Sequence, residues 1–255
     1  MYQQTIDQLH KDLFYLILYF QGEPYLHPLF FHMAKYAREK KIYTSTSTNA
    51  HFLTDQLAKK TVESGLDRII ISLDGLDQET YEKYRVGGSV EKVIEGTRNL
   101  VRWKKALKSQ TPFIILQFIV FSTNEHQLPL LRKMAKELGV DKLELKTAQV
   151  YNFEEGNPLL PQNGSYSRYK KKGANKYIID NPLYNHCLRM WRGCVITWDG
   201  LVVPCCFDKD ATHRLGDLKE QSFNEIWRGE AYDKFRKQLF SARSDIDICR
   251  NCTEK

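Results

Sequence analysis

The six cysteines of the chain lie in two short patches, and this clustering constrains the fold more than any other feature of the sequence. The first patch, from Cys187 to Cys206, reads CLRMWRGCVITWDGLVVPCC, and the second, from Cys249 to Cys252, reads CRNC. A hairpin and a tight turn can bring four thiolates from such patches together. The spacing therefore predicts a four-sulfur site, which zinc or an iron–sulfur cluster would fit equally well.

The rest of the composition is that of an ordinary globular protein. Of the 255 residues, 42% are hydrophobic and 27% are charged, enough for an α/β domain with a small appendage. No apolar run has membrane-spanning length, and the N-terminus lacks the features of a signal peptide. We therefore expect a cytoplasmic protein without a membrane partner, in which clustered cysteines favour metal chemistry over disulfides.

The net charge of +7 raises the question of a nucleic-acid partner. Apart from the run RYKKK at residues 168–172, the basic residues are spread among acidic ones, as on solvated helix faces. No zinc-finger, RRM or KH signature accompanies the charge. We expect no nucleic-acid partner, and a phosphate-rich or acidic peptide partner is the alternative left open.

The first 150 residues alternate apolar strand-like runs with amphipathic stretches, at the period of a βα unit. The predicted strands are residues 13–20, 42–48, 68–73, 113–121 and 142–147. The predicted helices are residues 28–40, 54–64, 78–84, 90–107 and 125–138, and Gly65 and Gly139 stand where two of them should end. This pattern predicts a parallel sheet covered by helices, curled into a partial (βα) barrel.

The first predicted strand is long and nearly all apolar, which is typical of an interior strand. At the edge of a sheet it would expose an unpaired row of hydrogen-bonding groups. We therefore expect this strand to have neighbours on both sides, and a strand that should precede it to be missing from the sequence.

The character of the sequence changes after Val150. Residues 151–185 are rich in Asn, Gly, Pro, Tyr and Lys without clear periodicity, so we expect a linker with functional loops. A compact unit follows at residues 186–255, with a hairpin whose turn is Asp199-Gly200 between residues 195–198 and 201–203. Ser222 and Glu225 predict a capping box at the start of a helix. The expected domains are residues 1–150, 151–185 and 186–255.

The C-terminal segments have a specific resemblance. CLRMW, VITWDGLVVPCCFD, RLGDL, SFNEIW and CRNC together resemble the SPASM/twitch module of radical S-adenosylmethionine (SAM) enzymes, which binds an auxiliary four-iron four-sulfur cluster. The resemblance to the single-cluster form implies that the ligands are Cys187, Cys205, Cys249 and Cys252. Cys194 and Cys206 are left over, and Cys206, next to Cys205 on a strand, should point to the opposite face. The tryptophans Trp191, Trp198 and Trp227 are expected to pack the core of this unit.

The N-terminal half resembles the same family at successive strand ends, where α/β barrels build their active sites. The sequence QGEP at residues 21–24 resembles the GGEP motif, TNA at 48–50 resembles the TNG segment, and ISLDG and YEKYRVGG follow in family order. Gly22 would let the backbone approach a ligand, and the Glu23 carboxylate would accept hydrogen bonds from the SAM amino group. The resemblance implies that SAM is bound by Gly22, Glu23, Asn49, Ser72, Asp74, Arg85 and Gln117, with Lys146 at a further matching position. Taken singly, each of these is also an ordinary turn, strand or surface residue.

The resemblance implies an enzyme that reductively cleaves SAM and abstracts hydrogen from a peptide or small-molecule substrate, with flavodoxin or ferredoxin as electron donor. The Cys-x-x-x-Cys-x-x-Cys loop that defines the family is not in this sequence, because no cysteine precedes Cys187. We therefore assign no catalytic residue, and expect an N-terminally truncated form that cannot cleave SAM by itself. The alternative is a non-catalytic iron–sulfur or zinc-binding protein that has lost the radical centre.

Overall fold

A computed structural model describes residues 1–173 and 176–253 of the chain. The chain forms two compact units. The larger unit consists of Asp12–Ala148 and Asn157–Ser167. The smaller unit consists of Met1–Lys11, Gln149–Gly156 and Arg168–Lys255, as far as these segments are described. No helix within the described ranges has both the length and the apolar composition needed to cross a membrane.

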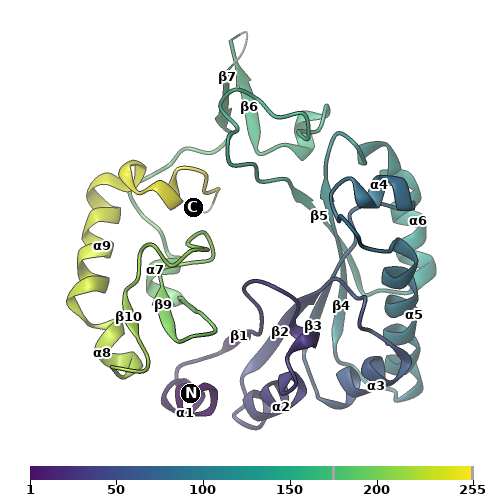
Figure 1. Cartoon of the computed structure of the whole chain (residues 1–255), viewed down its shortest axis with the longest axis horizontal. Coiled ribbons are helices and arrows are strands. Elements are labelled where there is room, and N and C mark those ends of the chain that lie inside the picture. The colour runs from purple at the N-terminus through teal and green to yellow at the C-terminus, as the bar shows by residue number, and fades with distance from the viewer. Residues whose placement is uncertain (174–175, 254–255) are drawn as a thin grey trace. The chain divides into compact units, whose positions relative to one another are not determined.

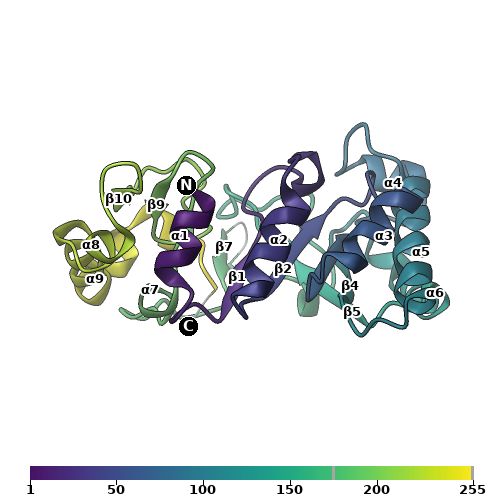
Figure 2. The same ribbon diagram turned by 90° about the horizontal axis from the view of Figure 1, so that it is seen from below.

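The larger unit is an α/β fold around a five-stranded parallel sheet (Figure 1). Its strands lie in sequence order: β1 (Tyr15–Ile17), β2 (Tyr43–Thr48), β3 (Arg68–Ser72), β4 (Phe113–Val120) and β5 (Lys142–Thr147). The connections contain α2 (Phe30–Glu39), α3 (Asp55–Glu63), α4 (Gln78–Glu82), α5 (Val90–Ala106) and α6 (Leu128–Leu138), with short 3₁₀ turns at Pro24–Leu26, Glu125–Gln127 and Gly164–Tyr166. Figure 2 shows α2, α3, α5 and α6 side by side along the sheet. The predicted α/β fold with a parallel sheet is thus confirmed.

Local signals in the sequence set the helix boundaries. The side chains of Thr54, Asp77 and Ser89 each accept a hydrogen bond from a backbone N–H in the first turn of α3, α4 and α5. At the other end, α6 stops at Gly139, whose φ of 73° lies in the left-handed region that glycine adopts without strain. These boundaries fix where each strand begins and therefore which residues reach the strand ends.

The two faces of the sheet have different characters. Alternate residues of the central strands pack with the helices in the main hydrophobic core, among them Ile69, Ile71, Leu116 and Phe118. The residues between them point to the opposite face. There, Ser72 pairs with Gln117 and Gln117 pairs with Glu144 across β3, β4 and β5. This second face therefore carries a polar row that runs across β3, β4 and β5.

The first strand differs from its prediction. Instead of spanning residues 13–20, β1 has three residues and lies at the edge of the sheet, paired with β2 alone. Phe14, Tyr15 and Ile17 are exposed, and the chain leaves the sheet after Leu18, whose N–H donates to Ser45. The predicted length of the strand was therefore wrong, whereas a second neighbour for it, which we expect to be missing from this sequence, stays a prediction.

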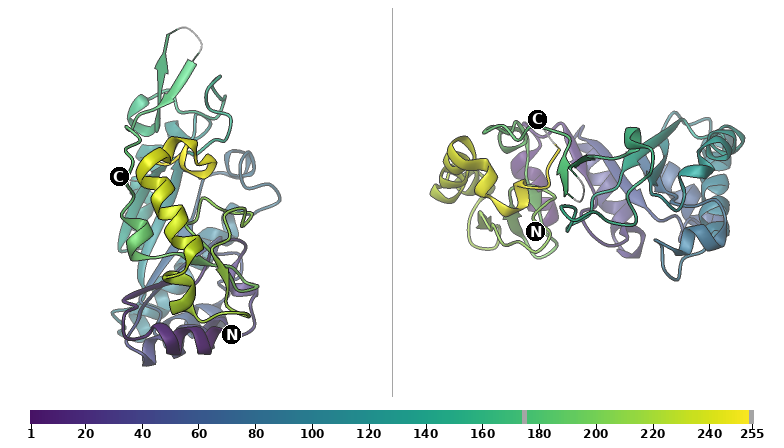
Figure 3. Two further views of the ribbon diagram at one scale, coloured as in Figure 1. Left: turned by 90° about the vertical axis from the view of Figure 1, so that its left-hand side faces the viewer. Right: turned by 90° about the horizontal axis from the view of Figure 1, so that it is seen from above.

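The smaller unit combines short strands with two C-terminal helices. Its elements are α1 (Tyr2–Leu9), β6 (Tyr169–Lys172), β7 (Lys176–Ile179), α7 (Arg189–Arg192), β8 (Val195–Ile196), β9 (Leu201–Val203), β10 (Gly216–Asp217), α8 (Phe223–Trp227) and α9 (Glu230–Ala242). Two 3₁₀ turns, Arg243–Asp245 and Asp247–Cys249, follow α9. The helix α9 is the longest element of this unit (Figure 3). Its buried residues Tyr232, Phe235 and Leu239 share a core with Met190 and Val202.

Several details of the smaller unit were predicted and others were not. The hairpin β8–β9 and the Ser222–Glu225 capping box are confirmed, and β10 adds an unpredicted third strand beside β9. The segment expected to be a linker contains the hairpin β6–β7, and its residues 174 and 175 lie outside the described part of the chain. Trp227 packs against the core as expected. Trp198 does not, because it is 91% exposed beside the hairpin turn.

Candidate functional site

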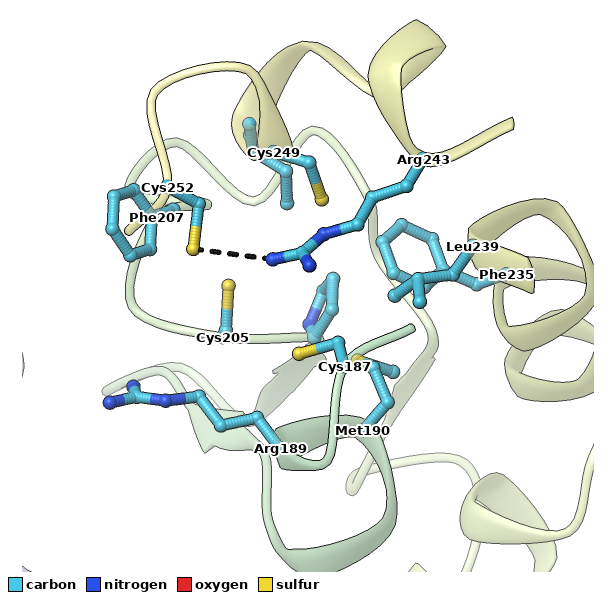
Figure 4. A pocket seen from close by; sticks show the side chains of 12 residues that line it. Cys187, Arg189, Met190, Cys205, Phe207, Phe235, Leu239, Arg243, Cys249 and Cys252 are labelled. Atoms are coloured by element: carbon cyan, nitrogen blue, oxygen red, sulfur yellow. Dashed lines mark hydrogen bonds between the residues drawn. The ribbon is translucent and has the colours of Figure 1, made fainter. Parts of the chain in front are cut away.

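Four cysteines of the smaller unit line one pocket. Cys187 precedes α7, Cys205 follows β9, and Cys249 and Cys252 lie in the last turn of the described chain. Figure 4 shows their side chains directed into a common space. The walls are largely apolar and are formed by Met190, Pro204, Phe207, Phe235, Leu239 and Ile248. The structure thus brings together the four cysteines that the sequence resemblance selects as ligands.

Two tight turns place these cysteines. The N–H of Cys252 donates to the carbonyl of Cys249 at 3.0 Å, so both thiols come from a single turn. After Cys205 the chain turns around Asp208, whose N–H donates to the Cys205 carbonyl at 3.1 Å. The carboxylate of Asp208 accepts hydrogen bonds from the backbone N–H groups of Thr212 and His213, at 2.8 and 2.9 Å. Asp208 is buried, and the sequence offered no signal for its role.

A buried arginine also reaches this pocket. Arg243 is 1% exposed, and its Nη1 donates to the carbonyls of His186 and Tyr184 at 2.6 and 3.1 Å. Its Nη2 lies 3.6 Å from the Sγ of Cys252, as the dashed line in Figure 4 marks. His186 takes part through its backbone carbonyl. Sequence reasoning missed Arg243 because it belongs to no cysteine motif.

Two thiols of the pocket have raised pKa values. Burial, together with the neighbouring Cys206, Cys249 and Cys252, raises the pKa of Cys205 to about 12. Burial also raises the pKa of Cys249 to about 11, although the Arg243 guanidinium opposes this shift. A metal centre supplies the positive charge that makes several buried thiolates stable together.

Four cysteine thiols around one pocket can hold either of two kinds of metal centre. A zinc site places its sulfurs at about 2.3 Å from a single ion. An iron–sulfur cluster spreads its four thiolates over separate iron atoms. The residues that line the pocket supply four thiolates for a centre of either kind.

The two remaining cysteines do not line this pocket. Cys194 packs against the core of the smaller unit, and burial raises its pKa to about 12 despite a hydrogen bond with Tyr232. Cys206 is exposed, and its Sγ lies 3.5 Å from Nη1 of Arg189. Both positions suit structural or surface residues.

In the larger unit, Glu23 joins the ends of the first two strands. One oxygen of its carboxylate accepts hydrogen bonds from Oγ1 of Thr48 at 2.8 Å and from the N–H of Tyr25 at 3.2 Å. The other oxygen accepts from the N–H of Asn49 at 2.8 Å. Gly22, with a φ of 77°, makes the turn that brings Glu23 to this position. The structure thus brings Gly22, Glu23 and Asn49 together.

Asp74 and Arg85 form a second cluster beyond the end of β3. Asp74 is 1% exposed, and one carboxylate oxygen accepts hydrogen bonds from Nε and Nη2 of Arg85 at 2.7 and 2.6 Å. The other oxygen accepts from the N–H of Ile119 at 2.7 Å. Burial raises the pKa of Asp74, and the Arg85 charge opposes that shift. Asn124, fully buried, donates to the Asp74 carbonyl at 3.0 Å and was not predicted from the sequence.

The polar row on the second face of the sheet contains further predicted positions. Ser72 lies 3.5 Å from Ser47, Oγ to Oγ, and pairs in register with Gln117. Glu144, the register partner of Gln117, forms an ion pair with Lys146, whose Nζ lies 3.0 Å from Oε1 of Glu144. Glu144 was missed because alternating charge on a strand is also typical of an exposed edge.

These features define a class of protein. The larger unit is a parallel α/β fold with its polar residues at the carboxyl ends of the strands, where such folds bind ligands. The smaller unit gathers four thiols around an apolar pocket. The class is a protein that combines an α/β fold of the ligand-binding kind with a small unit whose four thiols suit a metal centre.

Comparison with known families identifies the family. Residues 187–253 match the model of SPASM, an iron–sulfur cluster-binding domain, and residues 3–116 match the model of the radical SAM superfamily. The chain therefore contains a radical SAM domain and an SPASM domain. The four-iron four-sulfur cluster and SAM expected from the sequence are the cofactors that these two domains imply.

Similar proteins have different activities. The chain is 27% identical over 287 residues to the tungsten-containing aldehyde ferredoxin oxidoreductase cofactor-modifying protein of Pyrococcus furiosus, covering 99% of this chain and 79% of that protein. It is 28% identical over 251 residues to a probable GTP 3′,8-cyclase of Methanocaldococcus jannaschii, covering 84% of this chain and 78% of that protein.

Solved structures share the fold. The structure of anSMEcpe with bound AdoMet (SAM) aligns with a TM-score of 0.66 at 17% identity, covering 98% of this chain and 74% of that chain. That of BtrN in complex with AdoMet and 2-DOIA aligns with a TM-score of 0.54 at 18% identity, covering 99% and 78%. At these identities the likeness extends to the fold alone.

Proposed function

We propose that this chain is part of a radical SAM enzyme and that its SPASM domain binds one auxiliary four-iron four-sulfur cluster. The proposed ligands are Cys187, Cys205, Cys249 and Cys252. The single observation that carries the proposal is that these four side chains line one pocket, while Cys194 and Cys206 do not. The bound cluster would supply an electron-transfer or substrate-binding centre, and the protein supplies the thiolates, the apolar walls and the buried cation.

The proposed SAM site is formed by Gly22, Glu23, Asn49, Ser72, Asp74, Arg85 and Gln117 in the larger unit. Glu23 is held by two backbone N–H groups and a hydroxyl, which fix the position of its carboxylate at the strand ends. Arg85 is held by Asp74, so its guanidinium is positioned before a ligand arrives. Pre-positioned charges of both signs suit a zwitterionic amino-acid group, such as the methionyl part of SAM.

The substrate class is proposed as a peptide or a small molecule. Relatives whose names concern cofactor modification and GTP cyclisation support the small-molecule class. The structure of anSMEcpe with AdoMet and the Kp18Cys peptide, which shares the fold, is consistent with the peptide class. A flavodoxin or ferredoxin is the proposed electron donor, because reductive cleavage of SAM consumes one electron.

The 255-residue chain is proposed not to cleave SAM by itself. No cysteine precedes Cys187, so the larger unit contains no thiolate to hold the cluster that binds SAM. The test is to incubate the anaerobically reconstituted chain with dithionite and SAM and to measure 5′-deoxyadenosine by chromatography. We expect none above a control without protein. Catalytic formation of 5′-deoxyadenosine would overturn this part of the proposal.

The ligand set is tested by single substitutions. Cys187→Ala, Cys205→Ala, Cys249→Ala and Cys252→Ala should each reduce iron binding and alter the visible absorption of the cluster. The matched controls are Cys194→Ala and Cys206→Ala, which remove thiols of the same unit outside the pocket. Normal iron binding in Cys249→Ala together with loss in Cys194→Ala would refute the assignment.

A second candidate function is a non-catalytic zinc- or iron–sulfur-binding module. The absence of any cysteine before Cys187 is the observation that favours it. The two candidates differ in SAM binding, since only a preserved SAM site should bind SAM. Equilibrium binding of SAM to the chain, lost in Glu23→Gln and Arg85→Met, would favour the enzyme-derived function, and no binding would favour the module.

A further inference from the structure

Arg243, the buried arginine of the cysteine pocket, directs one of its donors at a cysteine sulfur. Arg243 lies at the end of α9, six residues before Cys249, and its buried side chain is directed into the pocket of the four thiols. Burial of a guanidinium is costly unless its donors and its charge are both matched. Its Nη1 is matched by two carbonyls, whereas its Nη2 is directed at sulfur.

We propose that Arg243 is a positioning residue that stabilises the reduced form of the auxiliary cluster. This inference rests on the proposed function, because it requires the cluster at the four cysteines. A four-iron four-sulfur cluster with four thiolate ligands is a dianion when oxidised and a trianion when reduced. A fixed positive charge beside the ligands therefore favours the reduced form more than the oxidised form, and raises the reduction potential.

The same side chain also links the two halves of the ligand set. Its Nη1 holds the carbonyls of Tyr184 and His186, just before Cys187. The N–H of Arg243 donates to Oδ1 of Asn185 at 3.1 Å, and Nδ2 of Asn185 donates to the Ser241 carbonyl at 3.0 Å. The segment before Cys187 is thereby tied to the chain that leads to Cys249 and Cys252. Arg243 can thus set both the position of the ligands and the charge next to them.

A second cation at the pocket provides a matched comparison. Arg189 also lines the pocket, but it is exposed to solvent, where water and salt screen its charge. Removing either arginine changes the net charge equally. Only removal of the buried charge should therefore have a large effect on the cluster, since interactions between charges are stronger at low dielectric constant.

The experiment is a redox titration of the reconstituted full chain with dithionite, which supplies the single electron, followed by EPR of the reduced cluster. We compare the reduction potential of the wild type with those of Arg243→Gln, Arg243→Lys and Arg189→Gln. At a fixed potential, Arg243→Gln should lower the ratio of reduced to oxidised cluster at least tenfold, which is about 59 mV for a one-electron couple. Arg243→Lys should shift less, because it keeps the charge, and Arg189→Gln should titrate like the wild type.

Each outcome decides the inference. An Arg243→Gln cluster with the wild-type potential would overturn it, as would an equal shift in Arg189→Gln. If Arg243→Gln binds no iron, Arg243→Lys decides: a loaded cluster in Arg243→Lys supports a role for the charge. Loss of iron in both, with melting curves that show the unit unfolded, would overturn that role and leave Arg243 structural. A wild-type chain without a four-iron centre would instead refute the proposed function.

Discussion

The pair formed by Asp74 and Arg85 allows a prediction of how charge is balanced at the proposed SAM site. Replacing Arg85 by Met leaves the Asp74 carboxylate buried with only the Ile119 N–H as a donor from the contacts described above. Removing one partner of a buried pair costs about 3–5 kcal/mol. Because the Arg85 side chain is 29% exposed, solvent weakens the pair, and we expect a loss of roughly 2–3 kcal/mol in the free energy of unfolding at pH 7.

Replacing the other partner of the pair should reduce the free energy of unfolding by less. Asp74→Asn removes the buried charge and leaves Arg85, which can turn toward water, so we expect a loss of about 1 kcal/mol. The double variant should be less destabilised than the two single losses added together, because the pair can be lost only once. Urea denaturation followed by far-UV circular dichroism measures all three.

The pH dependence of the free energy of unfolding tests this reasoning. Burial raises the pKa of Asp74 and Arg85 opposes this shift, so in Arg85→Met the folded pKa lies still higher. A carboxyl with a raised folded pKa favours the native state at low pH, and this contribution is lost as the pH rises through the folded pKa. The deficit of Arg85→Met should thus be smallest below about pH 4, near the unfolded pKa of Asp, and largest at neutral pH. Equal, pH-independent losses in both single variants would refute the reasoning.

Two further predictions concern packing and thiol reactivity. Gly96→Ala in α5 should destabilise the larger unit by roughly 2 kcal/mol despite the better helix propensity of alanine. The reason is that a Cβ at Gly96 would stand 2.5 Å from the Ala50 carbonyl oxygen. Thermal melting measures the loss, and Glu95→Ala on the exposed face of the helix is the control. A Gly96→Ala variant more stable than the wild type would contradict this packing. In the metal-free chain at pH 8, iodoacetamide should modify exposed Cys206 before Cys205 and Cys249, because their raised pKa values keep those thiols protonated. Peptide mass spectrometry follows the order, and faster modification of Cys205 than of Cys206 would contradict it.

The central strands and their helices could be predicted because their signals are local. Apolar runs mark β3 and β4, and polar caps such as Thr54 mark the helix starts. The length of β1 could not be predicted, because an apolar run does not mark where the chain leaves the sheet. The hairpin β6–β7 was missed since its strands are rich in lysine and tyrosine and lack the alternation of a half-buried strand.

The candidate site was only partly predictable. The four pocket cysteines could be selected because their spacing and flanking segments match a family pattern. Arg243 and Asp208 could not, because each acts through contacts that depend on the folded chain: a guanidinium directed at a cysteine sulfur, and a carboxylate that closes a turn. Glu23 was expected to bind the amino group of SAM, and its hydrogen bonds with Thr48 and Asn49 became visible only in the structure.

The most direct test of the central proposal is a count of metal and sulfide in the full chain after anaerobic reconstitution. Iron, acid-labile sulfide and zinc are measured on the same sample, with Mössbauer spectra to identify the iron species. The proposed auxiliary centre predicts about four iron and about four sulfide per chain and no stoichiometric zinc. About one zinc per chain without sulfide would contradict it and identify a structural zinc site at the same cysteines.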